Sequence, residues 1–120
     1  MNACVRVAAV LLGLTLSAST LAHAMLDRAS PRVGSSVKGA PDRVELWFTE
    51  PLERAFSTAK VLDARGRQVD RDDVAVDQND PRHLSVSLPP LPAGRYRVVW
   101  RAVSADTHAT AGDFVFDVSP

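Results

Sequence analysis

The sequence contains almost no sulfur. Its single cysteine, Cys4, lies near the start of the chain, and Met25 is the only methionine after Met1. A domain formed by the rest of the chain therefore has neither disulfide bonds nor thiolate ligands for a metal ion. A site that depends on clustered methionines is excluded as well.

The chain also lacks an excess of positive charge, because fourteen Lys and Arg side chains face fourteen Asp and Glu side chains. Nucleic acids are bound largely by neutralising their phosphates, so nucleic acid is not an expected partner. The only long apolar run covers residues 7–16. It is shorter than the roughly 20 residues that span a bilayer, so we expect no membrane insertion.

Residues 1–22 have the layout of a secretory signal peptide, with Arg6 followed by an apolar run and then small residues. We predict that its removal leaves one domain over residues 23–120, which is long enough for a single core. Two cuts have small residues at −3 and −1: one before His23 and one before Met25. On this pattern alone, the cut before Met25 is the better one.

Beyond the leader, apolar residues recur at every second position in several short runs, which is the period of half-buried strands. The clearest runs are RVELWF (43–48), HLSVSL (83–88), YRVVWRAV (96–103) and DFVFDV (113–118), and weaker ones are AMLDRA (24–29), STAKVLDA (57–64) and QVDRDDVAV (68–76). Links rich in Pro, Gly and Asp separate them. The pattern predicts an antiparallel sandwich or small barrel of about seven strands.

An acidic cluster, DRDDVAVDQND, covers residues 70–80. We interpret it as a solvated loop region. It could hold a hard cation only weakly, because it lacks the glycine and the terminal glutamate of an EF-hand loop.

Three histidines are present, and they differ in their surroundings. His83 has no acidic or histidine partner at ligand spacing, which indicates a surface residue. His108 follows Asp106 by two positions, and in extended backbone such residues project to the same side. Alone, this pair is a weak signal, which indicates a hydrogen-bonded loop pair more often than a metal site.

A chain that begins at His23 would add two further donors, its free α-amine and its own imidazole. Together with Asp106 and His108, this makes three nitrogens and one carboxylate oxygen. Such a set favours Cu(II), with zinc and nickel as competitors.

The motif WRAVSADTHATAG (100–112), preceded by LPAGRYRVVW and followed by FVFDV, resembles the carboxy-terminal signature of the CopC family of copper-resistance and copper-handling proteins of the bacterial periplasm. HAMLDRASPRVGS (23–35) and PDRVELWFTEPLE (41–53) are similar to the opening of the same family. The resemblance covers nearly all of residues 23–118. It implies an all-β, immunoglobulin-like or cupredoxin-like antiparallel β-sandwich with Greek-key connections.

The resemblance also implies which residues bind copper. His23 would supply amine and imidazole, and Asp106 and His108 would complete a site for one Cu(II) ion per chain. Glu50, in FTE, would be a nearby acidic residue that approaches the metal or hydrogen bonds to a ligand. The implied protein is a periplasmic carrier, not an enzyme, that acts as a monomer and passes copper to a CopD-type inner-membrane transporter.

Two departures from the family pattern matter. Members with a second, Cu(I) site carry a methionine-rich loop, and this chain has no methionine between Trp47 and Trp100. It therefore resembles the Cu(II)-only branch. Ala109 stands where many relatives have proline, a change that removes no ligand.

The family's mature chains begin with histidine, so the resemblance favours the cut before His23. While the leader is attached, the nitrogen of His23 is an amide and the four-donor site does not exist. Two alternatives stay open: a small oxidative enzyme of the histidine-brace type, and a metal-free β-sandwich interaction module. The short links between strands argue against the enzyme, and a cut before Met25 would favour the module.

Overall fold

The computed structural model describes residues 23–120, and the predicted signal peptide lies outside the described residues. Eight strands form in this range, and it contains no helix that could cross a membrane. They are β1 (Leu26–Ser30), β2 (Ser36–Lys38), β3 (Arg43–Phe48), β4 (Thr58–Leu62), β5 (Ala75–Val76), β6 (His83–Ser87), β7 (Gly94–Val103) and β8 (Ala109–Ser119). The prediction of an all-β sandwich is confirmed.

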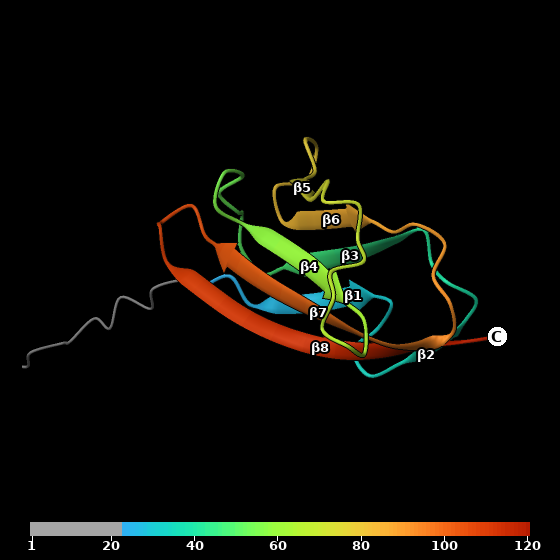
Figure 1. Ribbon diagram of the computed structural model, residues 1–120. Helices are drawn as coiled ribbons and strands as arrows, with labels where there is room; N and C mark the ends of the chain where they lie inside the picture. The colour runs from blue at the N-terminus through green and yellow to red at the C-terminus, as the bar shows by residue number, and fades with distance from the viewer. Residues whose placement is uncertain (1–22) are drawn as a thin grey trace, which may run out of the picture.

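The strands form two four-stranded sheets that pack face to face (Figure 1). One sheet has the order β1-β3-β6-β5, and the other has the order β2-β8-β7-β4. All neighbours run antiparallel except β2 and β8, which are parallel and pair Ser36 with Asp117. The sequence pattern did not predict β2, because its three residues are too few to show alternation.

The core lies between the sheets and is made of the alternating residues that the sequence pattern identified. These residues are at most 7% exposed because every second side chain of a strand faces the opposite sheet. They are Val44, Leu46 and Phe48 of β3, Leu84 and Val86 of β6, Tyr96, Val98, Trp100 and Ala102 of β7, and Phe114, Phe116 and Val118 of β8.

The prediction of a strand over residues 68–76 is wrong for most of its length, since only Ala75–Val76 forms β5. In the rest of this segment, side-chain hydrogen bonds take the place of the backbone hydrogen bonds of a strand. Asp70 accepts a hydrogen bond from the Val61 amide at 2.8 Å, and Asp73 accepts one from the Ser87 amide at 2.8 Å. The acidic cluster is therefore a loop whose carboxylates tie it to the neighbouring strands.

Gly112 of β8 lies opposite Trp100 of β7, and its lack of a side chain makes room for the indole. A Cβ atom at position 112 would lie 2.5 Å from Cζ2 and 2.8 Å from Cε2 of Trp100. Such distances require the ring or the backbone to move.

We therefore expect Gly112→Ala to lower the free energy of unfolding by about 1–3 kcal/mol, the usual cost of overpacking a core. Urea denaturation measures this change. Ala111→Val is the matched control, because Ala111 is exposed on the same strand and its substitution should cost less than about 0.5 kcal/mol. Equal stability of Gly112→Ala and wild type would show that the indole has room to shift.

Candidate metal centre

The β7–β8 link, residues 104–108, holds two of the predicted ligands in a tight turn. The Ser104 amide donates to the His108 carbonyl at 2.9 Å, and the Thr107 amide donates to the Ser104 carbonyl at 2.8 Å. Thr107 takes the left-handed conformation, with φ of 72°. Asp106 and His108 are thus brought together by a turn and not, as expected, by extended backbone.

The side chains of Asp106 and His108 meet within this turn. Asp106 Oδ1 lies 3.3 Å from His108 Nδ1. Nδ1 is shielded from solvent and has no well-aligned hydrogen-bond partner among the described residues. The two side chains remain 42% and 36% exposed, so an ion can reach them. The turn thus places a carboxylate oxygen and a ring nitrogen side by side in two partly exposed side chains.

Ser104, which the sequence analysis did not identify, orients the carboxylate of Asp106. The residue is only 2% exposed, and its hydroxyl donates to Asp106 Oδ1. This bond, together with one from the His108 amide at 3.3 Å, holds the pKa of Asp106 below its ordinary value. Asp106 is therefore ionised at neutral pH and ready to bind a cation.

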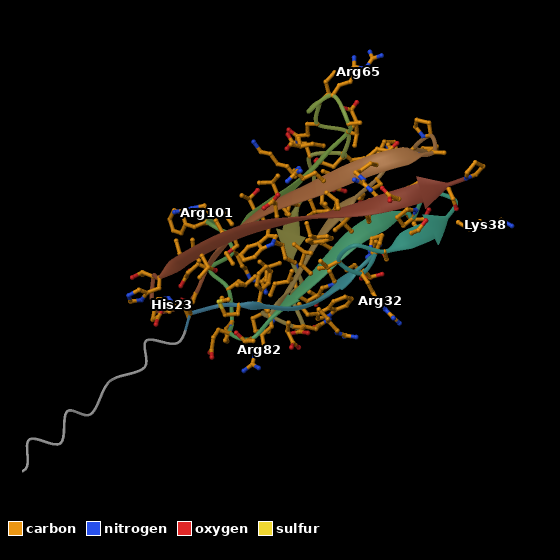
Figure 2. The ribbon with its side chains drawn as sticks, turned by 90° about the horizontal axis from the view of Figure 1, so that it is seen from below. His23, Arg32, Lys38, Arg65, Arg82 and Arg101 are labelled. Atoms are coloured by element: carbon orange, nitrogen blue, oxygen red, sulfur yellow. The ribbon has the colours of Figure 1, made fainter. Side chains whose placement is uncertain are left out.

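His23 lies beside the same turn, although it comes from the start of the described chain. Its ring centroid is 5.2 Å from that of His108, with the rings at 84°. Figure 2 shows His23 at one end of the sandwich and Lys38 at the other. Ala24, the next residue, is completely buried in the core. The fold thus brings His23, Asp106 and His108 to one end of the molecule.

Glu50 lines a small hollow of about 150 Å³ together with Pro51, Ser104, Ala105 and Asp106. Glu50 belongs to the segment that follows β3, a strand of the other sheet, and it shares this hollow with Asp106. Glu50 thus lies near Asp106, and its role as a metal ligand or as a hydrogen-bond partner of a ligand stays a prediction.

Within residues 23–120, no three His, Asp or Glu side chains form a cluster that could already hold a metal ion. The close contacts are pairwise, between His23 and His108 and between Asp106 and His108. His23 follows Ala22 in this chain, so its backbone nitrogen is an amide and not a donor. The fourth donor of the predicted set thus requires a free amine at His23.

His83 does not belong to this centre and lies on the outer face of β6, although neighbouring side chains cover more of it than the prediction of a simple surface residue implied. Only 13% of its side chain is exposed. Its ring stacks on Trp47 at 4.6 Å, and its nitrogens lie 3.3 Å from Glu45 and 3.8 Å from Asp77. Arg28 lies over the same indole, 4.0 Å from the ring centroid. Cross-strand register creates these contacts, which sequence spacing does not show.

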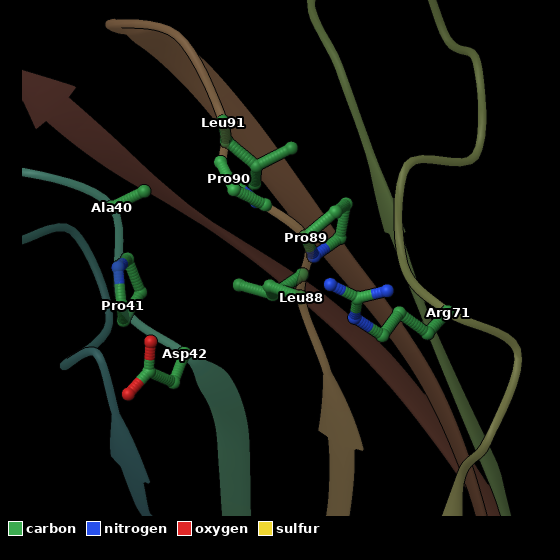
Figure 3. A pocket seen from close by; sticks show the side chains of 8 residues that line it. All are labelled: Ala40, Pro41, Asp42, Arg71, Leu88, Pro89, Pro90 and Leu91. Carbon is green, nitrogen blue, oxygen red and sulfur yellow. The ribbon is translucent and has the colours of Figure 1, made fainter.

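A larger hollow of about 510 Å³, shown in Figure 3, lies where β3 begins and β6 ends. Proline and leucine side chains line most of it, with Asp42 and Arg71 as its only charged residues. It contains no histidine, so it offers no alternative to the candidate centre as a site for a nitrogen-preferring metal.

Residues 26–119 match the CopC domain family. The chain is 37% identical to copper resistance protein C of Pseudomonas syringae pv. tomato over 112 residues, which cover 88% of each chain. It is 36% identical over 104 residues to the copper transport protein CutJ of Bacillus subtilis, covering 86% of this chain but only 19% of CutJ.

Two crystal structures share the fold. CopC from Methylosinus trichosporium OB3b has a TM-score of 0.73 and 33% identity, and the match covers 82% of this chain and 95% of that one. PcoC, a methionine-rich copper resistance protein from Escherichia coli, has a TM-score of 0.71 and 37% identity, covering 82% of this chain and 100% of that one.

Proposed function

The chain belongs to the CopC family, and on that premise we propose that it binds one Cu(II) ion through His23, Asp106 and His108 and carries it in the periplasm. Members of this family are copper-binding resistance proteins and not enzymes, so copper is its ligand. The observation that carries the proposed ligand set is the position of His23 against the turn that holds Asp106 and His108.

The proposed donors are the α-amine and imidazole of His23, the Asp106 carboxylate and the His108 imidazole. Three nitrogens and one oxygen suit the tetragonal geometry of Cu(II), and Met25 is the only sulfur-containing residue among residues 23–120, which therefore lack the clustered sulfur ligands that a Cu(I) site prefers. The hydrogen bonds that keep Asp106 ionised favour its role as an anionic ligand. Glu50 is the candidate for an additional ligand, from the edge of the same hollow.

The core packing supports the cut before His23 and a domain over residues 23–120. Ala24 is fully buried, and its carbonyl accepts a hydrogen bond from the Thr110 hydroxyl at 2.6 Å. A cut before Met25 would remove this residue from the core and leave the Thr110 hydroxyl without its acceptor. The sandwich is therefore better completed by a chain that starts at His23.

A carrier role follows from the position of the site. The candidate ligands lie partly exposed at one end of the sandwich, where a second protein can approach the ion. In CutJ, which is named a copper transport protein, the matching segment makes up 19% of the length. We infer that this chain acts as a monomer and hands copper to a separate membrane transporter of the CopD type.

Intact mass spectrometry of the exported protein, with and without Cu(II), tests the proposal. We expect the mass of residues 23–120 and an increase by one copper ion under native conditions. A chain that begins at Met25 would contradict the ligand set, because two of its four donors would be missing. Two bound ions would contradict the proposed stoichiometry.

A further inference from the structure

The segment His23–Ala24–Met25, here called the arm, is tied to both sheets by two threonine hydroxyls. Thr49 follows β3 in the first sheet, and Thr110 belongs to β8 in the second. The arm precedes β1 and carries the residue that we propose as the source of two copper donors. Its position therefore decides whether these donors face the turn at Asp106 and His108.

Thr49 makes three hydrogen bonds with the arm. Its amide donates to the Met25 carbonyl at 2.9 Å, and its hydroxyl accepts from the Met25 amide at 3.0 Å. The same hydroxyl donates to the His23 carbonyl at 3.4 Å. A hydroxyl has one proton to donate and two lone pairs, so Thr49 can accept and donate at the same time.

Thr110 fixes the arm from the other side. Its hydroxyl lies 2.6 Å from the Ala24 carbonyl and 3.5 Å from the Ala102 carbonyl of its neighbouring strand. Because a hydroxyl donates only one proton, the shorter contact with the arm takes it. Thr110 is two residues beyond His108, so this bond joins the arm to the strand that begins at the metal centre.

The methyl group of Ala24 completes the attachment, since this residue is completely buried between the two threonine contacts. A three-residue arm at a chain end would ordinarily fray. Here, each of its three carbonyl groups accepts a hydrogen bond, two of them from threonine hydroxyls and one from a threonine amide.

We propose that Thr49 and Thr110 form a latch that positions the arm, so that His23 is held against Asp106 and His108 before copper arrives. The proposal rests on the proposed function. Neither threonine touches the ion; both act through the backbone of the arm. Because the arm is ordered in advance, binding does not have to pay the entropy of ordering it. Loss of either hydroxyl should therefore weaken copper binding.

The test compares Thr49→Val and Thr110→Val with Thr49→Ser and Thr110→Ser in the exported protein. Valine keeps the shape and removes the hydroxyl, whereas serine restores it. Thr58→Val is the matched control, because Thr58 lies on β4, where the strand pairs with β7 and not with the arm. Two quantities are measured: Cu(II) affinity by chelator competition, and hydrogen exchange of the Met25 amide in the copper-free protein.

We expect each valine variant to lower Cu(II) affinity by about tenfold, the lower end of the range for residues that orient ligands. In the copper-free protein, exchange of the Met25 amide should accelerate by roughly tenfold, in Thr49→Val because this amide loses its acceptor and in Thr110→Val because the arm opens more often. The serine variants and Thr58→Val should stay within about twofold of wild type in both measurements. The unfolding midpoint of each variant is measured as well and identifies any variant that has lost its fold. If a valine variant is unfolded, the comparison of the serine variants with wild type tests whether a hydroxyl at these positions is sufficient.

Three results would overturn the latch. Valine variants with wild-type exchange would show that the hydroxyls do not hold the arm. Faster exchange with wild-type affinity would show that holding the arm does not matter for copper. A wild-type protein that binds no copper would refute the proposed function, and with it the role of the latch. That last failure is seen in the wild type alone, which separates it from the first two.

Discussion

Acetylation of the His23 amine should lower Cu(II) affinity by at least about 100-fold. An acetylated nitrogen is an amide, which keeps its proton and has no lone pair available at neutral pH. Since removal of a residue that merely orients a ligand costs 10–100-fold, removal of a ligand should cost at least the upper end of that range. The fold should be unaffected, because the His23 side chain is exposed.

The chain is well suited to this experiment because it has only two lysines beyond the terminus, Lys38 and Lys60. Mild acetylation near neutral pH prefers the terminal amine, since α-amines are ordinarily less basic than lysine side chains. The double variant Lys38→Gln, Lys60→Gln imitates the unwanted modification and should bind copper like wild type. Undiminished affinity of the acetylated protein would remove the amine from the ligand set.

His108→Ala should also lower Cu(II) affinity by at least about 100-fold, whereas His83→Phe should leave it within about twofold. His108 supplies a ring nitrogen that is shielded, unpaired among the described residues and 3.3 Å from Asp106. His83 lies on the outer face of the other sheet, where it stacks on Trp47. Phenylalanine preserves that stacking, so the second variant removes only the imidazole nitrogens and their contacts with Glu45 and Asp77.

Chelator competition at one pH measures the Cu(II) affinity of both variants, and the d–d absorption of bound Cu(II) reports a change in its ligands. We expect His83→Phe to keep the wild-type spectrum and His108→Ala to change or lose it. Equal weakening by the two substitutions would contradict the site, because it would mean that copper binds wherever imidazoles are available. Wild-type affinity in His108→Ala would remove this residue from the ligand set.

The strands around the core could be predicted because their cause is local. Alternation in RVELWF, YRVVWRAV and DFVFDV places one face of each strand towards the opposite sheet, and this pattern needs no knowledge of the partner strand. The same reasoning overestimated the strand at residues 68–76. There, Asp70 and Asp73 accept hydrogen bonds from backbone amides outside the segment, and no local sequence pattern predicts such contacts.

The pairing of Asp106 with His108 was predicted from their spacing, but for a reason that the structure does not support. The residues lie in a turn closed by Ser104, and the left-handed Thr107 redirects the chain between them. The motif nevertheless identified two side chains that lie close together, because a five-residue link between the paired strands β7 and β8 leaves the backbone few conformations. Ser104 was not predicted, because the sequence does not distinguish a buried serine that hydrogen bonds to Asp106 from an exposed loop serine.

The amino-acid sequence was enough to identify an all-β domain, its core residues and a histidine–carboxylate motif, because each of these depends on residues a few positions apart. Only the folded molecule brought His23 to His108, buried Ala24, placed Glu50 beside Asp106 and drew His83 into a stack with Trp47. These neighbours come from distant segments. Their meeting depends on how the sheets pair and pack, which is a property of the whole chain and of no single stretch.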